Sequence, residues 1–291
     1  MGNIIIVAET GSDIPIDVAN RNGIYLVPMH VSLGDTTLDD GSFPVLKICE
    51  YYSETGKLPK TSGSSPEDFE KVFDEIHSLW PEKHILHLAY SSATTCSYQS
   101  ALLIGEERDY VTSIDTKHVS AGQAAVILKM ARILEEVPGL SQKEVYETVD
   151  QVCRQTHMCF LPGDLEYLRA GGRVSNTAYL GGRLLHLHPC IEIIDGHLLV
   201  TQKYRGSMLK IVPRLIREFS RKHQLQNEHL YLLWSIGLDE DIRVAAEAEA
   251  KNCGFHEITW IQTGCVITAH CGPGAFGMVG FSESAQDILN I

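Results

Sequence analysis

Short apolar segments alternate with amphipathic segments through the first half of the chain. Four of them are predicted to form buried strands: Ile4–Ala8, Gly23–Val31, Ile85–Ala89 and Tyr110–Ile114. Helical patterns lie between and after these segments. Such alternation is typical of a parallel sheet covered by helices, so the first half is predicted to be an α/β unit.

The clearest helix signal follows Ser65. Apolar residues at helical spacing form one face there: Phe69, Val72, Phe73, Ile76 and Leu79. Ser65 suits the N-cap and Pro66 suits the first helical position. Capping-box spacings predict the start of two more helices, Ser120 with Gln123 and Ser141 with Glu144.

The pattern changes after about residue 158. Ile191–Ile194 and His197–Lys203 flank Asp195-Gly196, which suits a tight type I′ turn, so a hairpin is predicted. Further strands are predicted at Leu230–Ser235, Ile258–Gln262, Val266–Ala269 and Phe276–Phe281, and helices at Ser207–His223 and Asp239–Cys253. The prediction is therefore two domains: residues 1–158, α/β, and residues 159–291, α+β with antiparallel pairing.

The composition is that of a soluble globular protein. The chain has 291 residues, of which 44% are hydrophobic and 21% charged. This length is enough to bury a sizeable core with a cavity inside it. The net charge of −13 repels nucleic acid and anionic membranes, so neither is expected as a partner.

A cytoplasmic location is expected. The start of the chain, Met1–Val7, lacks a cationic region and a long apolar run, so it does not resemble a signal peptide. No stretch approaches the ~18 apolar residues of a membrane span. The eight cysteines are scattered without a Cys-x-x-Cys pair, which favours reduced thiols.

Three turns that follow predicted strands are rich in hydroxyl groups and glycine: Glu9–Ser12, Thr61–Ser65 and Ser91–Thr95. Ligands of parallel α/β sheets bind beyond the carboxyl ends of the strands. Free N–H groups at a following helix N-terminus attract an anion, and neutral hydroxyls beside them suit a single carboxylate. The alternative is that these residues only cap helices and form turns.

Two histidine-containing segments were considered as sites. His270, at the end of the predicted strand Val266–Ala269, can donate a hydrogen bond to a carboxylate, although a lone histidine is more often structural. His186, His188 and Cys190 stand at alternate positions, a pattern that suggests metal ligands, but no second ligand group has metal-site spacing, so packing is favoured.

Motifs of nucleotide binding and catalysis are not convincing. Gly272-x-Gly274-x-x-Gly277 matches the dinucleotide fingerprint, but its Pro273 and the lack of a following helix favour a plain turn. The chain also lacks a P-loop and the signatures of metalloproteases, serine hydrolases and kinases. These observations argue against an enzyme.

Nine segments occur in the order in which the DegV family has them: Val27–Met29, Asp39–Gly41, Lys60–Phe69, Ser91–Ser92, Tyr98–Ala101, Ile114–Thr116, Leu165–Ser175, Lys203–Gly206 and Ala269–Ala275. Each is short, but the ordered set is specific, above all the Leu-Glu-Tyr-Leu-x-x-Gly-Gly-Arg stretch. The chain thus resembles a DegV protein from residue 1 to about residue 281.

The resemblance implies a Rossmann-like first domain and a second domain whose interior takes the acyl chain of one long-chain fatty acid. The carboxylate would lie at the domain junction, where it would be met by Thr61 and Ser62, by Thr95 and by His270. Cys96 belongs to the same ligand-binding turn. The implied protein is a carrier without catalytic residues, cofactor or metal.

The resemblance also implies a partner. Well-studied bacterial members present the fatty acid to a fatty acid kinase, and Arg173 and Arg205 match positions associated with docking that kinase. On the following helix Lys210, Arg214, Arg217 and Arg221 form a basic stripe. Its opposing face, expected to be buried, carries Leu209, Val212, Ile216 and Phe219. The stripe is either a docking surface or a solvated face balanced by nearby acids.

The chain departs from the family pattern at several positions. Glu9-Thr10-Gly11 stands where Asp-Ser-Thr is usual, Ser64 replaces a Pro and Cys271 replaces a Thr. Thr95 keeps a hydroxyl, but Cys96 replaces a Gly whose φ is expected to be positive or whose backbone approaches the ligand. These changes are expected to alter the head-group geometry and the preferred lipid.

The alternative function is that of an enzyme. A lipid hydrolase or a phosphotransferase would use Ser62 or Thr95 as nucleophile and His270 as base.

Overall fold

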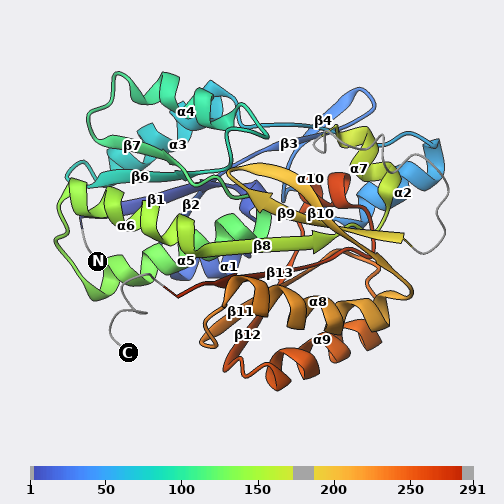
Figure 1. Cartoon of the computed structure of the whole chain (residues 1–291). Helices are drawn as coiled ribbons and strands as arrows, with labels where there is room; N and C mark the ends of the chain where they lie inside the picture. Colours follow the sequence, from blue (N-terminus) through green and yellow to red (C-terminus); the bar gives the residue numbers. More distant parts are fainter. Residues whose placement is uncertain (1–2, 173–186, 284–291) are drawn as a thin grey trace.

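The computed structural model describes residues 3–172 and 187–283, which form three sheets and the helices that cover them (Figure 1). The first sheet is parallel, with the strand order β2-β1-β6-β7. Its strands are β1 (Ile4–Glu9), β2 (Tyr25–Val27), β6 (His84–Ala89) and β7 (Val111–Asp115). The α/β prediction for the first half is therefore confirmed.

Both faces of the central strands β1 and β6 are buried, as their largely apolar sequences require. Ile5 and Val7 of β1 pack with Phe69 and Phe73 of α3 (Pro66–Leu79) and with α4 (Ser97–Gly105). The other face packs against α5 (Ser120–Glu136). The 3₁₀ turn η1 (Thr10–Ser12) and the helix α1 (Ile16–Arg21) connect β1 to β2.

A small antiparallel sheet lies beside the parallel one, in the order β4-β3-β5. It comprises β3 (His30–Leu33), β4 (Thr36–Asp39) and β5 (Lys60–Ser62), and α2 (Leu46–Thr55) connects β4 to β5. The single strand predicted at Gly23–Val31 is wrong, because the chain leaves the parallel sheet at Pro28, which has no N–H to donate to a ladder.

The third sheet has six strands in the order β10-β9-β8-β13-β11-β12. They are β8 (Thr156–Leu161), β9 (Leu187–Ile194), β10 (His197–Arg205), β11 (His229–Trp234), β12 (Glu257–Gln262) and β13 (Phe276–Phe281). Only β11 and β12 pair in parallel. The predicted hairpin is confirmed, with positive φ at both Asp195 and Gly196.

Helices cover both faces of this sheet. α8 (Met208–His223) and α9 (Glu240–Asn252) form one core with it, and their bounds lie within one residue of the predicted helices. α5 and α6 (Gln142–Gln155) pack on β8. The predicted buried face of α8 is wrong at Leu209, which is 46% exposed; the inward residues are Ile211, Val212, Leu215, Ile216 and Phe219.

The strand predicted at Val266–Ala269 is wrong, because these residues lie in the helix α10 (Cys265–Cys271). Its apolar residues are buried on all sides, so the run carries no one-sided periodicity that would distinguish a short buried helix from a strand. His270 therefore ends a helix rather than a strand. α10 lies beside α7 (Leu165–Gly171) and contacts β3 and β5 (Figure 1).

One predicted capping box is confirmed and one is wrong. Ser141 and Glu144 form the box that begins α6. The N-cap of α5 is Val119, and the Ser120 hydroxyl donates to Asp13 while the Gln123 side chain donates to Glu9. Tertiary partners thus replace the local capping bonds.

The largest apolar cluster joins the two halves of the chain. It includes Leu88 and Val126 from the first half and Ile191 and Val279 from the second. The six-stranded sheet begins with Thr156, close to the predicted boundary near residue 158, which we keep as a proposal. Within the two described ranges, no helix is long and apolar enough to cross a membrane.

Candidate functional site

Four of the residues predicted to meet a carboxylate line one cavity. Thr61, Ser62, Thr95 and His270 surround a space of about 40 Å³. The remaining lining residues are Met29, Gly63, Tyr90, Thr94 and Val266. The fold therefore brings together Thr61 and His270, which are 209 positions apart in the sequence.

Two turns, one helix and Met29, which lies between β2 and β3, supply the walls of this head-group cavity. The first turn runs from Thr61, at the end of β5, to Ser65, the N-cap of α3. The second lies between the carboxyl end of β6 and the start of α4. Val266 and His270 project from α10, so residues from both sides of position 158 form the site.

Hydroxyl groups and the imidazole form the polar side of the cavity. Thr61 Oγ1 and His270 Nε2 share a hydrogen bond of 2.8 Å, in which the tautomer decides the donor. Thr95 Oγ1 and Ser97 Oγ lie 3.1 Å apart, and Ser64 N donates to Ser97 Oγ at 3.0 Å. The two turns thus contact each other directly.

Gly63 permits this contact between the turns. A Cβ atom at position 63 would lie 2.3 Å from Thr95 Oγ1 and 2.5 Å from Ser97 Oγ. Both distances are far below van der Waals contact, so any larger residue would separate the hydroxyls of the two turns.

A second glycine, Gly171, makes room for His270. It is the last residue of α7, and a Cβ there would lie 2.2 Å from His270 Nδ1. The Leu165–Gly171 part of the most specific sequence segment is therefore the helix that packs against the site histidine. Sequence reasoning used this segment only as a family signature and missed its role beside the site.

The Ser91–Thr95 turn is fixed from the second half of the chain. Ser91 Oγ donates to the carbonyl of Gly196, at the tip of the β9–β10 hairpin, at 2.9 Å. Ser92 Oγ donates to Asp115 Oδ2 at 2.5 Å. The hairpin, which sequence analysis treated as a structural feature, thus holds the turn that carries Thr95.

The Glu9–Ser12 turn forms hydrogen bonds with two residues that line the cavity. Thr10 Oγ1 accepts from Met29 N at 3.0 Å, and buried Glu9 accepts from Tyr90 N at 2.9 Å. Burial alone would raise the pKa of Glu9, but the adjacent His87 and the hydrogen bonds from Gln123 and Tyr90 outweigh it and hold the pKa below its usual value. An ionised Glu9 therefore anchors Tyr90, which lines the cavity.

Cys96 adjoins the cavity without lining it. It is exposed, follows Thr95 directly and precedes α4 with a φ of −86°. Its φ is negative, so the backbone of this chain does not adopt at Cys96 the positive φ considered for the glycine of the family. A direct contact between Cys96 and a ligand stays a prediction.

The predicted docking arginines are placed only in part. Arg205 ends β10 and is exposed, while Arg173 lies outside the described residues. On α8, Arg214 pairs with Glu218 and Arg217 pairs with Glu249, each at 2.7 Å. Acids therefore balance at least two positions of the basic stripe.

In the segment with alternate His186, His188 and Cys190, the described residues have other roles than metal binding. His188 Nε2 hydrogen-bonds the carbonyl of Gly206 at 3.1 Å, Cys190 is buried and His186 lies outside the described residues. In residues 3–172 and 187–283, no group of three or more His, Cys, Asp or Glu side chains is placed to hold a metal ion.

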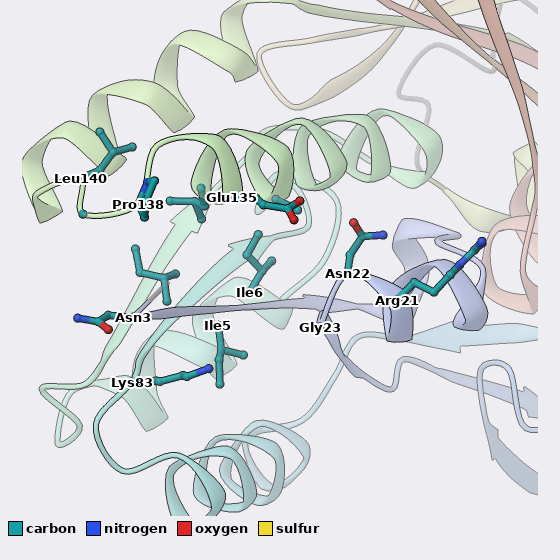
Figure 2. A pocket seen from close by; sticks show the side chains of 14 residues that line it. Asn3, Ile5, Ile6, Arg21, Asn22, Gly23, Lys83, Glu135, Pro138 and Leu140 are labelled. Atoms are coloured by element: carbon teal, nitrogen blue, oxygen red, sulfur yellow. The ribbon is translucent and has the colours of Figure 1, made fainter. Parts of the chain in front are cut away.

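Two larger pockets lie away from these residues. One of about 750 Å³ is bordered by the start of β1, by Arg21–Gly23 and by the end of α5 (Figure 2). It lies at the amino end of β1, whereas α/β sheets bind ligands at the carboxyl ends of their strands. Its basic side chains are engaged, Arg21 with Asp17 at 2.8 Å and Lys83 over the Trp80 ring.

The other pocket, of about 540 Å³, contains Glu192, Lys222 and His223. Burial opposes ionisation of Glu192, but hydrogen bonds from His223, Lys222 and Thr201 outweigh it and lower its pKa to about 2. Because Glu192 already holds these partners, the cluster is a satisfied ion-pair network rather than an open anion site.

Comparisons with known proteins cover almost the whole chain. The model of the DegV family, described as a family of uncharacterised proteins, matches residues 3–283. A DegV domain-containing protein of Caldanaerobacter subterraneus subsp. tengcongensis is 30% identical over 96% of this chain and 98% of its own. A protein of Thermotoga maritima named fatty acid-binding protein is 26% identical over 94% of this chain and 95% of its own.

The fold is shared with solved structures. A structure described as showing fatty acid binding of a DegV family protein from Thermus thermophilus superposes with a TM-score of 0.86 at 30% identity. It covers 97% of this chain and all of the other.

Proposed function

Because the chain belongs to the DegV family, we propose that it binds one long-chain fatty acid, with the carboxylate in the head-group cavity formed by Thr61, Ser62, Thr95 and His270. The observation that carries the proposal is the 2.8 Å contact between Thr61 and His270 inside a hydroxyl-lined cavity. The names of relatives from Thermotoga maritima and Thermus thermophilus support it, since both refer to fatty acid binding.

The cavity suits a carboxylate in size and chemistry. Its volume of about 40 Å³ accommodates a small polar group but is far below the ~300–1,000 Å³ of sites that enclose drug-sized ligands. Hydroxyl groups and an imidazole can each donate a hydrogen bond to an oxygen of the carboxylate. Hydrogen bonds to a charged group contribute roughly 1.5–3 kcal/mol each.

The acyl chain would continue from the apolar wall of the cavity. Met29, Tyr90 and Val266 line that wall and belong to the large apolar cluster that joins the two halves of the chain. Each methylene buried there would contribute about 0.8 kcal/mol. On this proposal the acyl chain enters between residues 1–158 and residues 159–291 of the protein. Apolar side chains of the cluster move apart to admit the acyl chain.

One observation favours a second candidate. A threonine hydroxyl 2.8 Å from an imidazole is also the spacing of a nucleophile and its base. A lipid hydrolase or a phosphotransferase would use this pair, with Thr61 in the place that sequence analysis assigned to Ser62 or Thr95. We favour the carrier because the related proteins are named for binding.

We expect the purified protein to carry about one C14–C18 fatty acid per chain. Mass spectrometry of the denatured protein and of its organic extract measures this directly. A carrier gives a chain of unmodified mass and an intact fatty acid in the extract. An acyl adduct on Thr61 would establish the enzyme instead, and extracts without lipid from several expression hosts would contradict the proposal.

We further propose that the bound fatty acid is presented to a fatty acid kinase in the cytoplasm. All eight cysteines are free thiols, as the reducing cytoplasm favours. Exposed Arg205 would grip a carboxylate or phosphate of the kinase in a bidentate manner, and Arg173 would act with it.

The docking role predicts a separation of two properties. Arg205→Ala and Arg173→Ala should retain lipid but lose acyl-phosphate formation with a cognate kinase, much as added salt would cause. Arg21→Ala is the matched control, since Arg21 is an exposed arginine of α1 whose partner is Asp17. Kinase turnover by the Arg205 and Arg173 variants equal to that of the control would refute docking and leave lipid binding unaffected.

A further inference from the structure

Two buried carboxylates from the first half of the chain hold the start of α10. Gly264 N donates to Asp13 Oδ1 at 2.7 Å. Cys265 N and Val266 N donate to Asp40 Oδ1 at 2.9 and 3.3 Å. Asp13 and Asp40 are each only 6% exposed, although aspartate is rarely buried without a role.

These bonds replace the local cap that α10 lacks. The first N–H groups of a helix have no partner within the helix, and a side chain at the N-cap usually satisfies one of them. The N-cap of α10 is Gly264, which has no side chain to accept such a bond. The cap is therefore supplied from Asp13 and Asp40, more than 220 positions away along the chain.

The other end of the same helix carries the site histidine. His270 lies in the last turn of α10, four residues after Val266 or about 6 Å along the helix axis. A helix of about two turns moves as one rigid unit, so the position of its first turn sets the position of the His270 imidazole. The imidazole must be placed precisely enough for His270 Nε2 to lie 2.8 Å from Thr61 Oγ1.

Asp40 also connects the helix to another wall of the cavity. Asp40 N donates to the carbonyl of Met29 at 2.8 Å. Thr10 Oγ1 in turn accepts from Met29 N at 3.0 Å. Asp40 therefore connects two walls of the head-group cavity: its backbone N–H bonds Met29, and its carboxylate holds the helix that carries His270.

Burial raises the pKa of both carboxyl groups, that of Asp13 well above its usual range, and the charge of Asp40 raises the pKa of Asp13 further. A neutral acceptor of the same shape is therefore a fair substitute at either position. Asparagine keeps the oxygen that accepts from the helix, whereas alanine removes it.

We propose that Asp13 and Asp40 are positioning residues for the fatty-acid carboxylate: they fix the first turn of α10 and thereby hold His270 against Thr61. This inference rests on the proposed function, because it assigns the two aspartates to the geometry of that same site.

A double-mutant cycle with palmitate as the probe tests this. Asp40→Ala should weaken palmitate binding about tenfold in the parent protein, the scale of a lost helix cap. In a His270→Ala background it should change the affinity by less than about twofold, because the group that it positions is gone. Asp40→Asn should restore binding to within about threefold of the parent.

Asp39→Ala is the matched control, because Asp39 is adjacent, its side chain is 60% exposed and its partner is His30. It should bind palmitate as the parent does. If Asp40→Ala does not fold, Asp40→Glu replaces it in the same cycle, since the longer side chain keeps the acceptor but displaces it by one methylene.

The outcomes separate the inference from the function. Equal weakening by the Asp40 variant in both backgrounds would show a purely structural role and overturn the inference, as would unchanged affinity in the parent. If His270→Ala alone leaves palmitate binding unchanged, the proposed head-group site is itself wrong, and the positioning role falls with it.

Discussion

Gly171→Ala is expected to weaken fatty-acid binding at least as much as removal of the His270 side chain does. The added methyl group would lie 2.2 Å from His270 Nδ1, so either the imidazole turns away from Thr61 or α7 separates from α10. Either movement breaks the hydrogen bond from His270 to the carboxylate. A bond of this kind contributes roughly 1.5–3 kcal/mol, which corresponds to about a 10- to 150-fold increase in Kd.

Gly105→Ala provides the matched control for this prediction. Gly105 is the last residue of α4, as Gly171 is of α7, and a Cβ there would meet only Val111 Cγ1 at an ordinary 3.7 Å. Displacement of a fluorescent fatty acid measures both variants. Parent-like affinity of Gly171→Ala would mean that α7 does not constrain the site.

Thr61→Val is expected to raise the Kd for a fatty acid by about 10- to 150-fold, because valine keeps the shape of threonine but cannot hydrogen-bond an ionised carboxylate. Thr95→Val and His270→Ala should act in the same direction. Thr61 and His270 share a hydrogen bond. The loss of binding free energy in the double variant should therefore be smaller than the sum of the losses in Thr61→Val and His270→Ala.

Thr36→Val is the control, because Thr36 is an exposed threonine in β4 of the same three-stranded sheet. The Tm of the lipid-free protein should be close to the parent value for Thr61→Val and for the control, since Thr61 is only partly buried. Tight binding by Thr61→Val with an unchanged Tm would exclude this threonine from the head-group site.

Local sequence signals predicted the parts of the fold that depend on neighbouring residues. The capped helix after Ser65 and the hairpin at Asp195-Gly196 follow from side chains within a few positions of each other, and both are confirmed. The strand predicted at Val266–Ala269 failed, because burial on all sides removes the periodicity that identifies a helix.

In the candidate site, too, some features could be predicted from the sequence and others depend on the packing of distant segments. The resemblance to a family pointed to Thr61, Thr95 and His270, and the structure brings them to one cavity. No local pattern relates Asp40 to Cys265 or Gly171 to His270, because these contacts exist only after distant segments have packed. The side chains that arrange the site are therefore harder to predict than those that line it.

The electron density of the protein crystallised with palmitate would show directly where the fatty-acid carboxylate binds. We expect one carboxylate within about 2.6–3.2 Å of Thr61 Oγ1 and His270 Nε2, with the acyl chain running into the apolar cluster that includes Met29 and Val266. A carboxylate seated instead in the pocket of Figure 2, beside Arg21 or Lys83, would contradict it.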